Sequence, residues 1–173
     1  MRERFEDKEG KRRLVEVFAS QELALQDRDL ARSLADIAEV NECEEKRELY
    51  AEGDPGKNCL YFIISGAFDL LGNGDYVRTV RAGQAVGEFP ILNPSVNYSA
   101  TIRARERSVV ALVSEGRFLS VANEHPEIWK NMAKMLAKRS RACWVMNHRP
   151  ARAADRMSAM VTSPYYNPKP ALS

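Results

Sequence analysis

The middle of the chain, residues 41–113, is divided by turn-forming residues into short β-prone runs, and this pattern restricts the possible folds most strongly. Turn formers recur at 52–56 (EGDPG), 72–75 (GNGD), 81–84 (RAGQ) and 93–95 (NPS). Strands about eight to twelve residues apart are typical of a sandwich or a jelly-roll barrel. Asn73 and Gly74 lie between two such runs and predict a hairpin, because both residues accept a positive φ.

Helical periodicity flanks this β region on both sides. Leu14 and Phe18, then Leu30 and Leu34, predict two short amphipathic helices within residues 1–40. Ser114 is expected to cap a further helix, and His125–Pro126 to open a longer one. The apolar stripe of the longer helix is Ile128, Met132, Met135, Leu136, Cys143 and Met146. We therefore expect N-terminal helices at 1–40, a β-barrel core at 41–113, C-terminal helices at 114–148, and a proline-rich linker or tail at 149–173.

Composition excludes several classes of function. The formal net charge of +2 is too small for a binder of polyanions, and the basic residues after Lys130 are expected to be a solvated helix face, so no DNA binding is predicted. No apolar run approaches the roughly 20 residues of a membrane span, and the N-terminus has no secretory signal. Three widely spaced cysteines indicate reduced thiols, which predicts a cytoplasmic protein without membrane contact.

Catalytic and metal-binding patterns are not found in the sequence. His125 and His148 lack cysteine or acidic partners at metal-ligand spacing, and no serine or cysteine has a histidine and an acid placed for a catalytic triad. We therefore expect no metal, no cofactor and no enzymatic activity in this chain.

The segment 83–92 (GQAVGEFPIL) carries the most specific chemistry. Gly87 allows the backbone to approach a ligand closely, and the helical turn it would begin directs N–H groups at an anion, as in a phosphate cradle. Glu88 beside it can accept hydrogen bonds from a sugar hydroxyl. Phosphate and sugar together suggest a nucleotide.

These residues resemble the cyclic nucleotide-binding domain of bacterial catabolite activators, cyclic-nucleotide-dependent kinases and gated channels. The resemblance runs from about residue 24 to 140 and uses these motifs in order: EGDPG at 52–56, YFIISG at 61–66, Gly83, Gly87–Glu88, SAT at 99–101, Phe118 and His125–Pro126. It implies a mainly β fold with flanking helices: a jelly-roll β-barrel (double-stranded β-helix) with N-terminal helices and a C-terminal lid helix.

The resemblance also implies a ligand site for a cyclic mononucleotide. Gly87 and Glu88 would contact the cyclic phosphate and the ribose 2′-hydroxyl, and Ser99 and Ala100 would contact the phosphate. Either Trp144 or Cys143 of the lid would cover the base, or Trp144 would instead pack on the barrel or on a second copy. The full set of expected ligand-binding residues is Leu70, Arg78, Val86, Gly87, Glu88, Phe89, Tyr98, Ser99, Ala100 and Trp144.

One position departs from the family pattern. The arginine that pairs with the phosphate in relatives is replaced by Tyr98. A charged hydrogen bond is worth roughly 1.5–3 kcal/mol, so this replacement lowers affinity for the usual ligand by about 10- to 100-fold. Arg78, on the strand after the hairpin, is a candidate for a cation that approaches from another direction.

A narrower resemblance is to bacterial antiphage effectors of the Pycsar type, in which a cyclic nucleotide-binding domain precedes a TIR domain. It uses the opening residues RERFE, the segment GKRRLVE at 10–16, and the proline-rich end without a helix-turn-helix. Such effectors respond to cUMP or cCMP, and their TIR domain hydrolyses NAD. The resemblance implies a sensor that controls an attached NAD hydrolase by ligand-induced helix movement and assembly.

Three alternatives stay open at this stage. The domain is a cAMP-type sensor, or a degenerate fold that acts as a dimerisation or interaction scaffold, or a transcription factor of the catabolite-activator type. The last is disfavoured because the residues after Pro150 are too few for a winged helix. Partners expected besides the nucleotide are further copies of the chain, in a homodimer or higher homo-oligomer, with pairing through Ile128, Met132 and Met135 of the long helix.

Overall fold

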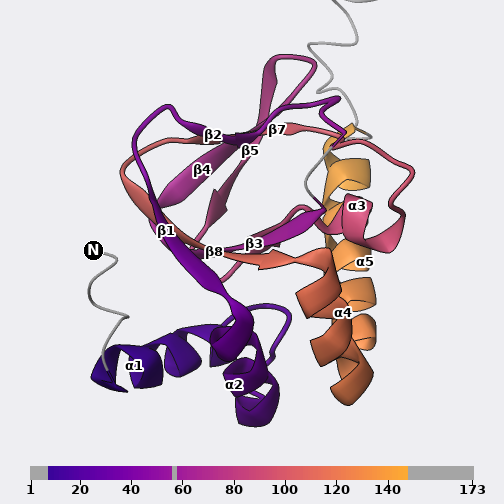
Figure 1. The fold of residues 1–173 in the computed structure, drawn as a ribbon. Coiled ribbons are helices and arrows are strands. Elements are labelled where there is room, and N and C mark those ends of the chain that lie inside the picture. Colours follow the sequence, from indigo (N-terminus) through magenta and orange to yellow (C-terminus); the bar gives the residue numbers. More distant parts are fainter. Residues whose placement is uncertain (1–7, 56–57, 148–173) are drawn as a thin grey trace, which may run out of the picture. The chain divides into compact units, whose positions relative to one another are not determined.

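Two four-stranded antiparallel sheets form the centre of the computed structural model, which describes residues 8–55 and 58–147. One sheet has the order β1 (Glu39–Cys43), β8 (Ser108–Ser114), β3 (Cys59–Ser65) and β6 (Ala85–Val86). The other has the order β2 (Glu48–Tyr50), β7 (Thr101–Ala104), β4 (Ala67–Gly72) and β5 (Asp75–Arg81). Figure 1 shows the two sheets facing each other. The predicted jelly-roll barrel is confirmed.

The core of the barrel is filled from both sheets. Tyr61, Ile63 and Val110 project from one sheet, and Phe68, Val80 and Ile102 project from the other. Six of the seven residues of β3 are buried, because this strand lies between β8 and β6 with side chains against the barrel on one face and against the helices on the other. Burial of a large apolar side chain stabilises a fold by about 1.5–3 kcal/mol, so the buried side chains of β3 contribute strongly to the stability of this barrel.

The hairpin expected at residues 73–74 is present. Asn73 has φ 52° and Gly74 has φ 84°, and the flanking residues Gly72 and Asp75 are paired across β4 and β5. Two consecutive positive φ values are those of a type I′ turn, whose twist matches the twist of the strands it joins.

Two helices precede the barrel, α1 (Lys8–Ala19) and α2 (Arg28–Ile37). The expected apolar face is buried on both: Phe18 and Leu30 have no exposed surface. Phe18 meets Phe62 of β3 edge to face, with ring centroids 5.0 Å apart. Asp27 caps α2, since its carboxylate accepts hydrogen bonds from the N–H groups of Asp29 and Leu30, both at 3.0 Å.

The loop between α1 and α2 bonds to the barrel and to a later helix. Gln21 Nε2 donates to the carbonyl of Ile63 at 3.1 Å, and the carboxylate of Glu22 accepts from the N–H of Ala85 at 2.9 Å. Leu23 accepts a hydrogen bond of 2.9 Å from the Asn131 side chain. The loop therefore connects β3, β6 and the start of the last helix.

The other helices are α3 (Glu88–Leu92), α4 (Glu115–Glu124) and α5 (Glu127–Asn147). Ser114 occupies the N-cap position of α4, but its side chain makes no capping hydrogen bond, so that part of the expectation is wrong. The described residues up to Met135 form one compact unit, and a second unit begins at Leu136. Within the described ranges no helix is both long enough and apolar enough to cross a bilayer.

The expected pairing of two copies through the start of α5 is also wrong. Ile128, Met132 and Met135 are at most 4% exposed within a single chain. Side chains already enclosed by their own fold offer no surface to a second copy. The expected linker at 149–173 lies outside the described residues.

Candidate functional site

Gly87 begins the short helix α3 with a conformation that requires glycine. It has φ 91° and ψ 18°, in the left-handed region. A Cβ atom at this position would lie 2.5 Å from the carbonyl oxygen of Cys59 and 3.4 Å from the Tyr61 ring. The turn predicted at Gly87 therefore exists, and it packs directly on β3.

Glu88 and Phe89 follow Gly87 and face opposite environments. Glu88 is only 6% exposed, whereas Phe89 is 49% exposed. Val86, before the glycine, is buried and pairs with Tyr61. A buried carboxylate is an acceptor of hydrogen bonds, which is the chemistry that a sugar hydroxyl requires. We expect Glu88 to contact a ligand from inside this turn, and Phe89 to contribute only from its rim.

Tyr98 packs inside the fold against a second tyrosine. Its side chain is 4% exposed, and its ring stacks on Tyr50 with centroids 3.7 Å apart and an angle of 12°. Tyr50 in turn lies 5.6 Å from Tyr61, whose ring borders Gly87. Three tyrosines and Gly87 thus form one contiguous cluster.

The hydroxyl groups of Tyr61 and Tyr98 are neutral near pH 7. Burial, more than any other cause, raises the pKa of both Tyr61 and Tyr98 above the ordinary value of 10.0, and the two phenols are close enough to affect each other. The Tyr98 hydroxyl is buried, and the Tyr61 hydroxyl and the backbone of Cys59 lie close enough to influence its pKa through hydrogen bonding. A neutral phenol carries one O–H donor, which Tyr98 can direct at an acceptor brought into the site.

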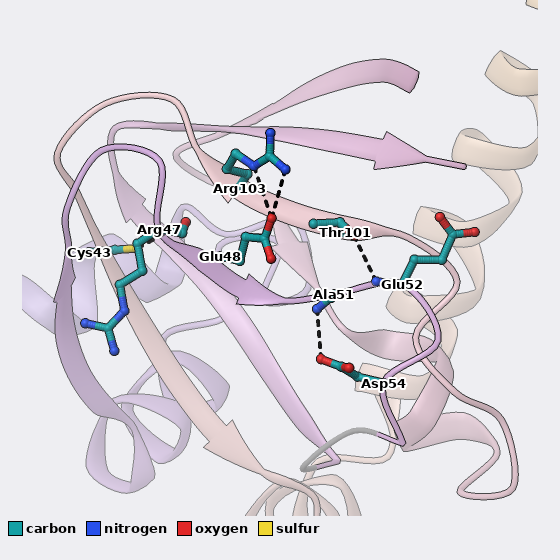
Figure 2. Close-up of polar contacts among 8 residues, drawn as sticks. All are labelled: Cys43, Arg47, Glu48, Ala51, Glu52, Asp54, Thr101 and Arg103. Carbon is teal, nitrogen blue, oxygen red and sulfur yellow. Dashed lines mark hydrogen bonds and ion pairs between the residues drawn. The ribbon is translucent and has the colours of Figure 1, made fainter. Parts of the chain in front are cut away.

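The backbone of Tyr98 is held by the loop 51–54. Gly53 N–H donates to the Tyr98 carbonyl at 2.9 Å, and Tyr98 N–H donates to the Asp54 carbonyl at 3.1 Å. Figure 2 shows how the loop keeps its shape: the Asp54 carboxylate accepts from Ala51 N–H at 3.1 Å, and Thr101 Oγ1 accepts from the N–H of Glu52 at 2.9 Å.

The same loop also bonds to the hairpin. The Glu52 carboxylate accepts a hydrogen bond of 2.7 Å from the N–H of Asn73. Residues 52–54 of the EGDPG segment therefore connect Tyr98 to the β4–β5 hairpin. Between Tyr98 and β7, Ser99 is exposed and Ala100 is half-buried.

Arg78 belongs to a row of side chains on the inner face of the second sheet. In the register of the strands, Tyr50 pairs with Ile102, Ile102 with Leu70, and Leu70 with Arg78. Paired residues share a face of a sheet, and this face is the inner one because Ile102 has no exposed surface and Leu70 packs on the core. Arg78 is half-buried, and it shares its face with the fully buried Val80 two residues later.

The structure thus brings most of the expected ligand residues to one end of the barrel. Val86 and Gly87 border Tyr61, whose ring meets Tyr50 and, through it, Tyr98. Leu70 and Arg78 continue from Tyr50 along the inner row. Sequence reasoning missed Tyr50, because a period-two pattern places it on the same face as the exposed Glu48, and the pairing of β2 is irregular between these two residues. Trp144 falls in α5, but its side chain lies outside the part that the structure describes. Among the described residues, no three acidic, histidine or cysteine side chains gather as a metal site would require.

Comparison with known proteins identifies this arrangement. The family model of the cyclic nucleotide-binding domain matches residues 40–125. The chain carries a cyclic nucleotide-binding domain. Solved structures share the fold of this domain: one from Methylobacillus flagellatus has a TM-score of 0.65 at 18% identity and covers 83% of this chain and 86% of that one. The catabolite activator protein of Thermus thermophilus has a TM-score of 0.58 at 21% identity, over 74% of this chain and 58% of that one.

Relatives with higher sequence identity are Pycsar effector proteins. BcPycTIR of Burkholderia cepacia is 39% identical over 139 residues, which is 80% of this chain and 46% of that protein. PaPycTIR of Pseudomonas aeruginosa is 36% identical over 137 residues, which is 79% of this chain and 44% of that protein. The chain therefore spans less than half the length of these relatives, and the part it shares with them is the sensor domain.

Proposed function

We propose that this cyclic nucleotide-binding domain senses a cyclic pyrimidine nucleotide, cUMP or cCMP, and controls an output domain of an antiphage effector. The observation that supports this most is the 39% identity to a Pycsar effector over a segment that includes the whole barrel. The replacement of the phosphate-pairing arginine by the buried Tyr98 concerns the cyclic phosphate that cUMP, cCMP, cAMP and cGMP share, so the choice of base rests on other residues.

In this proposal each part of the site has a separate task. Backbone at Gly87 approaches the cyclic phosphate, and the buried carboxylate of Glu88 accepts a hydrogen bond from the ribose. Tyr98 donates its buried hydroxyl to a phosphate oxygen, which replaces an ion pair by a hydrogen bond from a neutral donor. Val86, Ser99 and Ala100 line the pocket, Phe89 forms its rim, and Trp144 of the last helix closes over the base.

Output follows from a change in the last helix. A ligand shifts an equilibrium between two conformations only by its different affinity for each, so the helix must contact the ligand or the barrel better in the bound state. We propose that this movement promotes homo-oligomerisation in the cytoplasm and activates a TIR domain that hydrolyses NAD. In a protein that contains both domains, the activating nucleotide should increase the rate of NAD loss.

A second candidate function is supported by one feature of the site. The Tyr98 ring stacks on Tyr50 and fills space inside the barrel. Such filling is expected in a domain that no longer binds a ligand and serves as a scaffold. This candidate predicts no binding of any cyclic mononucleotide.

Calorimetric titration of the full chain with cAMP, cGMP, cUMP and cCMP separates these functions. We expect heat of binding for a pyrimidine nucleotide with a dissociation constant at least tenfold below those of cAMP and cGMP. Absence of binding for all four nucleotides contradicts the sensor and supports the scaffold. Tight binding of cAMP or cGMP alone contradicts the pyrimidine assignment.

Two glutamate variants test the site itself. Glu88→Gln removes the charge from the buried acceptor and should weaken binding by about tenfold or more, since hydrogen bonds to charged groups are worth roughly 1.5–3 kcal/mol. Glu106→Gln makes the same change at an exposed position and should leave affinity unaltered. Equal affinities for the two variants would place the ligand away from Glu88.

A further inference from the structure

Arg78 lies at the opposite end of the inner row from the tyrosine cluster. Tyr50, which stacks on Tyr98, is on β2, and Arg78 is on β5, with β7 and β4 between them. Neighbouring strands are about 4.8 Å apart, so three spacings separate the two backbones by at most about 14 Å along the sheet. A phosphate bound beside Tyr98 and Gly87 is therefore at the far side of the site from the Arg78 backbone.

The residues between these two ends are apolar. Ile102 and Leu70 occupy the two middle positions of the row, and both pack on the core of the barrel. Ile102 has no exposed surface, so the half-buried Leu70 is the apolar floor of the row that a ligand can reach. A nucleotide whose phosphate lies at the Tyr98 end would have its base over this floor and the edge of its base near Arg78. Water is scarce on such a floor, so a polar group that finds no partner there costs more than it does at the surface.

We infer that Arg78 selects the base of the bound nucleotide and favours a base that presents carbonyl oxygens at its edge. This inference rests on the proposed function. A guanidinium carries five N–H donors and no acceptor. Uracil presents the O4 acceptor, as thymine does, whereas cytosine presents an amino group at the same position. Arg78 can donate to the first, but it leaves the second facing another donor.

The inference narrows the ligand to one of the two pyrimidine nucleotides. The O4 atom of cUMP accepts a hydrogen bond from a guanidinium that the amino group at the same position of cCMP cannot accept, and discrimination of this kind by arginine corresponds to about tenfold or more in affinity. The same chemistry predicts a higher affinity for cGMP than for cAMP, because guanine presents O6 and N7 acceptors where adenine presents an amino group.

The test compares affinity ratios rather than single affinities. The full chain, Arg78→Ala and Arg78→Gln are titrated with cUMP, cCMP, cGMP and cAMP, and circular dichroism and thermal unfolding report whether each variant keeps its fold. Arg81→Ala is the matched control, because Arg81 is on the same strand, three residues later, on its exposed face. We expect the wild type and Arg81→Ala to bind cUMP about tenfold or more tightly than cCMP.

Arg78→Ala should bring the cUMP to cCMP ratio near one. Arg78→Gln keeps a polar side chain and adds an acceptor for the cytosine amino group, so it should shift the ratio toward cCMP even if the alanine variant is unstable. A wild-type preference for cCMP, or a ratio that survives both Arg78 substitutions, overturns the inference but leaves the sensor function standing. If the wild type binds none of the four nucleotides, the proposed function fails and the inference fails with it.

Discussion

Replacing Gly87 by alanine tests whether the turn at the site depends on its close contact with β3. The left-handed conformation of Gly87 alone costs an alanine about 1–2 kcal/mol. The added Cβ would also lie 2.5 Å from the Cys59 carbonyl oxygen, well inside the 3.5–4.0 Å of an ordinary contact. Cys59 cannot move away easily, since it is paired with Ser114 of β8.

The expected loss of stability has two parts. Overpacking of a well-packed site costs typically 1–3 kcal/mol, so Gly87→Ala should lower the free energy of unfolding by about 2–5 kcal/mol. Gly74→Ala is the control: Gly74 has φ 84°, and a Cβ there meets no atom within 4 Å, so it should cost only the conformational part.

Urea unfolding of the full chain, followed by circular dichroism, measures both variants. A difference of 1 kcal/mol in the free energy of unfolding of a domain of this size shifts the melting temperature by about 2–4 °C. A thermal scan should therefore rank the wild type, Gly74→Ala and Gly87→Ala in the same order of stability. If Gly87→Ala is no less stable than Gly74→Ala, the contact with Cys59 does not restrict the turn and the argument from close approach is wrong.

Two further substitutions test the packing around the site. Because burial raises the pKa of Tyr61 above 10.0, ionisation favours the unfolded chain, and stability should be constant below about pH 10 and fall as the pH rises further. Urea unfolding measures the fall in the free energy of unfolding between pH 9 and 11. This fall should be smaller for Tyr61→Phe than for the wild type, whereas the exposed Tyr76→Phe should match the wild type. A fall in Tyr61→Phe equal to that of the wild type would contradict the assignment. Asn131→Ala leaves the Leu23 carbonyl without its 2.9 Å hydrogen bond and should cost about 1–3 kcal/mol in a denaturant titration, whereas its exposed neighbour Lys130→Ala should cost almost nothing. Equal stability of these two variants would refute the role given to Asn131.

Features set by neighbouring residues were predictable from sequence. The hairpin at Asn73–Gly74 and the left-handed turn at Gly87 depend on residues that accept a positive φ, and such preferences are local. The amphipathic faces of α1 and α2 follow from helical spacing alone. The capping by Ser114 was not predictable in the same way, because a residue type indicates where a helix begins but not which hydrogen bond its side chain makes.

The inner row from Tyr50 to Arg78 was not predictable, because it depends on register. Irregularities in pairing occur between Glu48 and Tyr50 on β2 and between Leu70 and Leu71 on β4. An extra residue in a strand reverses which side chains face inward beyond it, and the sequence carries no clear mark of where this happens. The stack of Tyr98 on Tyr50 has the same origin, since it joins a loop to a strand 48 positions earlier through a turn at 51–54.

The hydrogen bonds of the loop between α1 and α2 show that the cooperative folding unit is larger than the family signature. Residues 40–125 carry the signature. A fragment cut to those limits would leave the Ala85 N–H and the Ile63 carbonyl of the barrel without the partners that Glu22 and Gln21 supply. It would also expose the face of Phe62 that Phe18 covers. A domain fragment meant for ligand titrations should therefore begin before α1 and extend at least through Met135.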